Sequence, residues 1–247
     1  MKYIIVFCTV CLLSVSLMAQ PPQFVTKGKI EFERKYNMHK QFEDDGDWSE
    51  QLKKMIPQFN ITYFDLSFEG NRAVYKPGRD NSDNNKTSMF GSMPATENIV
   101  QSDFATQQFS AYKQVFEQNF LVQDSLVKFS WKITSETRKI AGFNCRRAET
   151  VIMDSVYVVA FYTDEIPVSG GPESFNGLPG MILGVAMPRV HLTIFATKLE
   201  MVDPKENDFK PLTKGKKVNV VTLKTTMAES LKRWGKYAQR YLWLTSI

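Results

Sequence analysis

Residues 156–202 read VYVVAFYTDEIPVSGGPESFNGLPGMILGVAMPRVHLTIFATKLEMV and carry the clearest strand and turn signals of the chain. It opens with residues 156–162, which are apolar on both faces and therefore predict a central strand of a sheet. Residues 181–186 and 190–202 predict a second pair of strands, which turns at residues 187–189. Strands that follow each other through short turns indicate a mostly antiparallel sheet.

The same stretch contains a Gly/Pro corner directly before the strand at 181–186. Glycine tolerates positive φ and the proline ring fixes φ near about −65°, so the sequence predicts a tight turn at residues 177–180 and a second kink at 170–172. We expect residues 164–180 to form a rigid crossover at a sheet edge with several unpaired backbone N–H groups, where a ligand carboxylate or a sugar hydroxyl can dock. The candidate binding residues are Gly171, Pro172, Gly177, Leu178, Pro179 and Gly180. The alternative is that these glycines serve only the path of the chain.

Period-two alternation extends the sheet on both sides of this stretch. Near the N-terminus, a predicted strand places alternate residues on one face of the sheet: Ile30, Phe32, Arg34, Tyr36 and Met38. A hairpin is predicted at 62–68 and 72–76, two to four strands in 104–133, and a hairpin that pairs 145–153 with 156–163. The predicted sheet is therefore large.

Two helices and one long loop complete the predicted elements. Asp47 and Glu50 have the spacing of a capping box, and apolar residues recur at helical intervals over 47–59, disturbed by Pro57. Thr226 and Glu229 repeat that spacing before an amphipathic stripe that reaches residue 241. Residues 77–98 are rich in Asn, Asp, Ser, Gly and Pro, which predicts a mobile polar loop.

These elements together predict a mainly β (α+β) architecture. We expect a curved antiparallel sheet or half-barrel, open and bowl-like, with two helices packed on its concave side. Residues 20–247 form one predicted domain.

The N-terminus has the pattern of a cleaved signal peptide. A short positive region precedes an apolar stretch at residues 4–17, and a small residue, Ala19, stands at the predicted cut. The sequence therefore predicts a signal peptide over residues 1–19, export of the chain and no transmembrane segment after the signal is removed.

Charge and cysteine content narrow the function classes. The chain has 247 residues, a net charge of +5 and three cysteines, and the positive charge is not gathered into a basic stripe, so the sequence predicts no nucleic-acid partner. Removal of residues 1–19 leaves Cys145, which is interpreted first as a buried small hydrophobe. The alternatives are a partner in an intermolecular disulfide and a reactive thiol, paired with His191 or not. His39, His191 and Cys145 do not have metal-ligand spacing, so no metal and no cofactor are predicted.

Residues 131–133, 140–148, 161–167 and 171–183 together resemble the signature of the GLPGLI family, with Met181 and Phe161 in place of Leu and Trp. The resemblance implies an exported protein of Bacteroidota, which are Gram-negative bacteria, in a family without an established activity. Members resemble accessories of outer-membrane nutrient receptors. A similar module resembles the bowl-like N-terminal domain of a secreted glycan-removing amidase.

The resemblance therefore favours binding over catalysis. The leading hypothesis is an exported, non-catalytic accessory or binding protein of the cell envelope, in the periplasm, on the cell surface or secreted. Its expected partner is an outer-membrane receptor or a small peptide or glycan ligand. The alternatives are a secreted hydrolase that acts on peptide or glycan, and a thiol- or metal-handling periplasmic protein.

Overall fold

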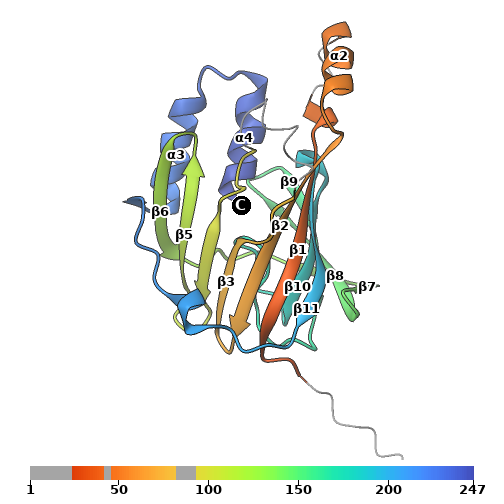
Figure 1. Cartoon of the computed structure of the whole chain (residues 1–247), viewed down its shortest axis with the longest axis vertical. Helices are drawn as coiled ribbons and strands as arrows, with labels where there is room; N and C mark the ends of the chain where they lie inside the picture. The colour runs from red at the N-terminus through yellow and green to blue at the C-terminus, as the bar shows by residue number, and fades with distance from the viewer. Residues whose placement is uncertain (1–23, 42–45, 82–92) are drawn as a thin grey trace, which may run out of the picture.

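The structure is a computed structural model that describes residues 24–41, 46–81 and 93–247 (Figure 1). The signal peptide predicted at residues 1–19, and residues 82–92 of the loop predicted at 77–98, lie outside the described residues. The described part contains one sheet of twelve strands: β1 (Lys27–Asn37), β2 (Phe59–Glu69), β3 (Arg72–Pro77), β4 (Ile99–Asp103), β5 (Gln108–Val115), β6 (Gln118–Ser125), β7 (Lys132–Ile140), β8 (Phe143–Ile152), β9 (Val156–Thr163), β10 (Met181–Met187), β11 (Leu192–Glu200) and β12 (Lys216–Val218).

The sheet is open, curved and almost entirely antiparallel, as predicted. The strand order is β12-β6-β5-β4-β3-β2-β1-β11-β10-β9-β8-β7. β12 pairs with β6 in parallel, whereas the other neighbouring strands of the described sheet pair in antiparallel fashion. β7 contacts β11 although three strands lie between them in the sheet, so this side of the sheet curls strongly. We call β12, β6, β5 and β4 the first arm and β10, β9, β8 and β7 the second arm.

A pair of C-terminal helices lies between the two arms. α3 (Val220–Leu231) contacts β6 and α4 (Lys236–Ser246), and α4 contacts the short helix η5 (Pro188–Val190) that joins β10 to β11. In Figure 1 the two helices stand side by side at one end of the sheet, next to β5 and β6. Of the two helices that the sequence predicted, the C-terminal one is therefore confirmed to pack on the curved sheet, where it forms this pair.

The predicted start of the C-terminal helix is wrong. Thr226 lies inside α3, which begins at Val220 because the side chain of Asn219 accepts a hydrogen bond from the Thr222 N–H at 2.8 Å. Gly235, with φ of 54°, then separates α3 from α4, so the single predicted helix is two helices.

The predicted helix at residues 47–59 is shorter and covers less of the core than expected. α2 (Asp47–Met55) ends where Ile56 adopts extended backbone, and Phe59 already belongs to β2. The N-cap of α2 is Gly46, which has no side chain to cap the helix, whereas the predicted capping box placed Asp47 at this position. Met55 is 62% exposed, and α2 projects beyond the sheet in Figure 1.

The core follows the predicted strand registers. The side chains of Ile30, Phe32 and Tyr36 in β1 are buried, and the Phe64 and Tyr75 rings stack at 4.7 Å across β2 and β3. Cys145 is also buried, which confirms the interpretation of this cysteine as a core residue. None of the helices in the described ranges combines the length and the apolar character that crossing a membrane requires.

Candidate functional site

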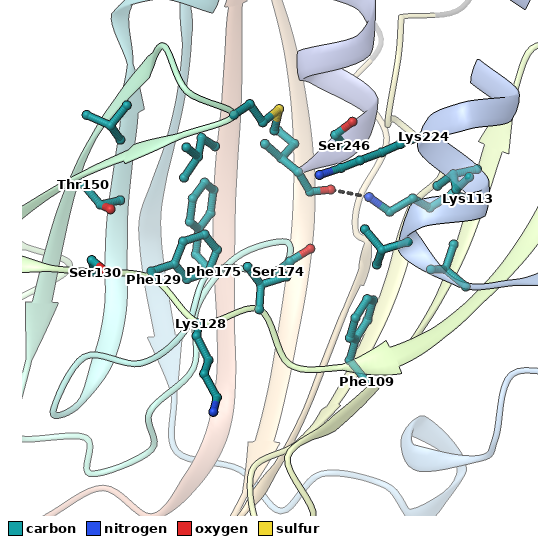
Figure 2. Close-up of a pocket in the computed structure, with 18 residues that line it drawn as sticks. Phe109, Lys113, Lys128, Phe129, Ser130, Thr150, Ser174, Phe175, Lys224 and Ser246 are labelled. Carbon is teal, nitrogen blue, oxygen red and sulfur yellow. Dashed lines mark hydrogen bonds between the residues drawn. The ribbon is translucent and has the colours of Figure 1, made fainter. Parts of the chain in front are cut away.

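A cavity of about 300 Å³ lies between the two arms, underneath α3 and the end of α4 (Figure 2). We call it the central cavity. Its lining comes from β5 and β6, the linker that follows β6, the end of β8, the 164–180 crossover and the C-terminal helices: Phe109, Lys113, Val122, Val127, Lys128, Phe129, Ser130, Thr150, Val151, Ile152, Met153, Ser174, Phe175, Val220, Leu223, Lys224, Ser246 and Ile247. A concave, mostly apolar site with a few polar groups is the usual form of a small-molecule site.

An aromatic cluster forms the wall between the cavity and the crossover. Phe129 and Phe175 line the cavity with their ring centroids 5.5 Å apart, and Trp131 packs behind them at 5.6 Å from Phe129. The indole N–H of Trp131 donates to the Asn176 carbonyl at 2.8 Å, which ties the crossover to the linker after β6. The aromatic wall is therefore held by ring packing on the cavity side and by this hydrogen bond on the crossover side.

Lys113 brings a buried charge to the cavity. Its side chain leaves β5, is 4% exposed, and donates to the carbonyl oxygen of Thr245 at 3.1 Å and to a carboxylate oxygen of Ile247, the last residue of the given sequence (Figure 2). Burial lowers the pKa of Lys113, the ammonium of Lys224 lowers it further, and the carboxylate of Glu173 opposes both effects.

Glu173 is the buried acid behind the cavity wall. It precedes the lining residue Ser174, is 2% exposed and has φ of 53°, which is uncommon for a residue with a side chain of this size. Its Oε2 accepts from the Asn98 amide at 2.9 Å, whereas its Oε1 has no hydrogen-bond partner in the described part of the chain. Burial raises the pKa of Glu173, against the attraction of Lys113 and Arg34.

Arg34 is the second buried cation of the interior. It occupies the inward register of β1 between Phe32 and Tyr36, and it donates to the Pro94 carbonyl at 2.9 Å. Its Nε has no partner among the described residues. Burial lowers the pKa of Arg34, and Glu173 opposes that shift. Arg34, Lys113 and Glu173 thus form one electrostatically connected group.

The six residues predicted as binding residues do not line the central cavity. Gly171, Pro172, Leu178 and Gly180 are buried, whereas Gly177 and Pro179 are exposed. Their neighbours Ser174 and Phe175 do line it. The crossover therefore contributes to the site through residues that the sequence reasoning did not select, and a ligand role for the six remains a prediction.

The expectation of unpaired N–H groups in the crossover is wrong at the positions where the structure gives their bonds. The N–H of Gly180 donates to the Leu178 carbonyl at 2.8 Å, and that of Gly177 donates to the Ser169 hydroxyl at 3.2 Å. The N–H of Gly170 donates to the Val168 carbonyl at 2.8 Å. The corner turns tightly enough to satisfy these groups itself.

Gly177 and Gly180 do adopt the positive φ that the sequence predicted, at 89° and 144°. A Cβ on Gly180 would lie 2.1 Å from the Thr163 carbonyl oxygen, at the end of β9. Glycine is therefore required for the close approach of the corner to the strand end, which is the structural role foreseen for this motif.

Cys145 and His191 do not form a nucleophilic pair. Arg146, the residue after Cys145 in β8, pairs with Tyr162 of β9. Tyr162 also pairs with Ile182, so Cys145 lies level with the start of β10. His191 follows η5 at the other end of β10, roughly 20 Å away along that strand. Burial also raises the pKa of the Cys145 thiol to about 12, so the reactive thiolate does not form at neutral pH.

Sequence reasoning missed the charged group of the interior. Arg34 carried a signal, because it stood in an otherwise apolar register of the first strand. No pattern in the sequence marked Lys113 and Glu173, because they lie far apart in the chain and only the fold brings their charges close enough to interact. Throughout residues 24–41, 46–81 and 93–247 there is no group of three or more His, Cys, Asp or Glu side chains that could hold a metal ion.

The fold and the cavity define a class of protein: an open, bowl-shaped β domain with a ligand-sized cavity under a helix pair. Residues 81–225, more than half of the chain, match the family described as "N-glycanase peptide, N-terminal domain", and the chain belongs to this family. Nothing in this match bears on the GLPGLI resemblance, which stays a prediction.

Solved structures of PNGF-II share the fold. The structures in space groups P21 and C2 each match with a TM-score of 0.53, at 15% and 16% sequence identity. The match covers 81% of this chain and 32% of the PNGF-II chain, so this chain spans about a third of the length of that protein. No curated protein matches the chain.

Proposed function

We propose that this chain is an exported, non-catalytic binding protein of the cell envelope that holds a small ligand in the central cavity. The observation that carries the proposal is the cavity itself. Its volume of about 300 Å³ is at the lower end of the range of small-molecule sites, and most of its lining side chains are apolar.

The chemistry of the lining supports binding rather than turnover. The polar side chains at the cavity are lysines and hydroxyls: Lys113, Lys128, Lys224, Ser130, Thr150, Ser174 and Ser246. Hydrolysis of a glycosidic bond uses a pair of facing carboxylates, and the lining side chains do not supply such a pair. The buried thiol of Cys145, with its pKa of about 12, also supports binding rather than catalysis by a cysteine nucleophile.

Binding is tested with 4-(dimethylamino)benzonitrile, a small neutral dye whose fluorescence changes in an apolar site and whose size matches the cavity. We expect saturable one-to-one binding to the folded protein. Ser130→Trp, which places a large ring at the cavity lining, should abolish the binding, whereas Lys132→Trp, on exposed β7 outside the lining, should preserve it. Equal binding to both variants would show that the dye does not enter the cavity.

The accessory role at an outer-membrane nutrient receptor follows from the GLPGLI resemblance and belongs to the same proposal. Export is tested by expression with the complete N-terminus and measurement of the mass of the secreted or periplasmic product. A mature chain that begins at Gln20 supports the proposal, and a cytoplasmic chain that retains residues 1–19 contradicts it.

The second candidate is a secreted hydrolase that acts on peptide or glycan, and the description of the matched family as an N-glycanase domain favours it. To distinguish hydrolysis from binding, the purified chain is incubated with glycopeptides and peptides, and the products are analysed by mass spectrometry. Enzyme-concentration-dependent turnover would replace the binding proposal.

A further inference from the structure

Exposed aromatic side chains gather at the end of the molecule where α3 meets α4. The ring centroid of Phe116, in the turn from β5 to β6, lies 5.2 Å from that of Trp234, between α3 and α4, and 5.0 Å from that of Tyr241 in α4. Phe116, Trp234 and Tyr237 are 39%, 43% and 40% exposed. Figure 1 shows the α3–α4 link and the end of β5 at the same end of the long axis. We call these four residues the aromatic tip.

The geometry of the β5–β6 turn does not favour an aromatic residue at position 116. Val115 pairs with Gln118 across the hairpin, so Phe116 and Glu117 form a two-residue loop, and Phe116 has φ of 55°. Such loops favour Gly, Asn or Asp, and a bulky ring at positive φ is an outlier. Strain of this kind gathers at functional positions, and here it accompanies a ring that is held at the surface.

A second cavity, of about 290 Å³, adjoins the aromatic tip between the β5–β6 turn and α3. Its lining is Val115, Phe116, Glu117, Gln118, Phe120, Thr226, Met227 and Ser230. Glu117, Gln118 and Ser230 are exposed, so this cavity opens to the surface beside the ring of Phe116. The residues of the aromatic tip do not line the central cavity, so the two features are separate.

Basic residues surround the aromatic tip. Residues 226–241 contain four basic residues and one acidic residue, Glu229, which pairs with Lys232. Arg233 is exposed and directly precedes Trp234. Glu117 in the turn is a second acidic residue, so the basic residues remain in excess. Exposed aromatic rings together with Lys and Arg are the composition of surfaces that lie in the interface of a lipid bilayer.

We propose that the aromatic tip docks on an anionic phospholipid surface, with the exposed rings at the level of the headgroups and the basic residues against the lipid phosphates. Charge complementarity selects this occupant over an uncharged apolar surface. The inference goes beyond the proposed function, because docking holds the chain at a membrane whether or not the central cavity is filled.

The test measures co-sedimentation of the chain with lipid vesicles at low ionic strength. Residues 20–247 are used, because the apolar stretch at 4–17 binds lipid by itself, and the described fold begins at residue 24. We expect binding to vesicles of equimolar phosphatidylglycerol and phosphatidylcholine to be at least about tenfold tighter than binding to phosphatidylcholine alone. A rise in ionic strength should reduce this preference, since salt screens exposed charges.

Phe116→Asn removes the exposed ring and supplies a residue that the turn favours, so the hairpin is retained. We expect it to weaken binding to the anionic vesicles about fivefold, because less apolar surface enters the interface. The matched control is Phe24→Asn. Phe24 is 55% exposed and precedes β1 at the opposite end of the molecule (Figure 1), so its replacement should leave the affinity unchanged.

Arg233→Glu tests the charge of the aromatic tip without a change in the core, because Arg233 is exposed. It should weaken binding to the anionic vesicles about fivefold or more and reduce the preference over phosphatidylcholine. Lys139→Glu, on exposed β7 of the second arm, is the matched control and should bind as the parent does.

Three results overturn the inference. They are no binding to the anionic vesicles, equal binding to the anionic and the neutral vesicles, and an unchanged affinity in Phe116→Asn or in Arg233→Glu. Circular dichroism of each variant confirms that the fold is retained.

Discussion

The crossover and the central cavity lie side by side, but they satisfy their polar groups in different ways. In the crossover, the backbone N–H groups of Gly170, Gly177 and Gly180 bond within the crossover itself. The buried charged side chains next to the cavity differ, because Arg34 Nε and Glu173 Oε1 have no hydrogen-bond partner among the described residues, although Glu173 itself belongs to the crossover. The Gly/Pro motif therefore satisfies its own backbone, whereas the buried charged side chains keep polar atoms that no described residue satisfies.

The largest effect is expected from a Cβ in the corner. Gly180→Ala places that atom 2.1 Å from the Thr163 carbonyl oxygen, which only a shift of backbone can relieve. We expect a loss of about 4 kcal/mol or more in the free energy of unfolding, measured by urea denaturation.

Gly177→Ala is the matched control for the corner. Its φ is also positive, but a Cβ there would find its nearest neighbour, Trp131 Nε1, at 3.7 Å. We expect a loss of about 1–2 kcal/mol, the cost of left-handed backbone alone. Equal losses in the two variants would contradict the assignment of close approach to Gly180.

The next effect concerns the buried carboxylate. Glu173→Gln removes the only buried carboxylate side chain among the described residues from the neighbourhood of Arg34 and Lys113, and we expect a loss of about 3 kcal/mol in urea denaturation at pH 7. Glu206→Gln, at a side chain that is 82% exposed, should change the stability by less than about 0.5 kcal/mol. If Glu173→Gln is as stable as the parent, the three charges are not coupled as described.

A smaller effect is expected at the start of α3, which forms one wall of the cavity. Asn219→Ala removes the cap that accepts from the Thr222 N–H, and we expect a loss of about 1 kcal/mol. Thermal unfolding followed by circular dichroism measures it. Asn219→Ser, which retains a capping oxygen, should recover most of the loss, and its failure to do so would argue against capping at this position.

The smallest effect at neutral pH belongs to Cys145. Burial raises its pKa to about 12, so the folded protein retains the thiol proton more tightly than the unfolded chain does. The stability from this group is complete below the ordinary thiol pKa of 9.0 and is lost as the pH rises from there to about 12. Cys145→Ala should remove this component from the pH dependence of urea denaturation.

Thiol labelling at pH 8 checks the same group directly. The native protein should react with a disulfide reagent at least roughly a hundredfold more slowly than the protein in urea, because the thiolate fraction is so much smaller. Rapid labelling of the native protein would restore the hypothesis of a reactive thiol.

The strands were predictable because their burial follows local alternation. The registers of β1 and β2 and the hairpin that joins β8 to β9 can be read from residue types alone. The helix boundaries were not predictable from residue types. Thr226 and Glu229 have the spacing of a capping box, but they lie inside a helix that Asn219 already caps. The apolar stripe also continues across Gly235, which hid the break between α3 and α4.

The candidate site was predictable only in part. The crossover was recognised because glycine and proline restrict the backbone locally. The central cavity was not, because it joins residues from β5, β8, the crossover and the C-terminal helices, which come together only through the curvature of the sheet. Arg34 was visible as a charge in an apolar register, but its partner Glu173 was hidden among the residues of the corner motif.

The most direct test of cavity binding is a crystal structure of the chain soaked with a small neutral bromoalkane such as 1-bromooctane, in which anomalous scattering locates the bromine atom. We predict bromine inside the central cavity, against the wall that Phe129 and Phe175 form. Bromine bound at residues 177–180, with the central cavity free of ligand, would contradict the account and assign the binding site to the corner.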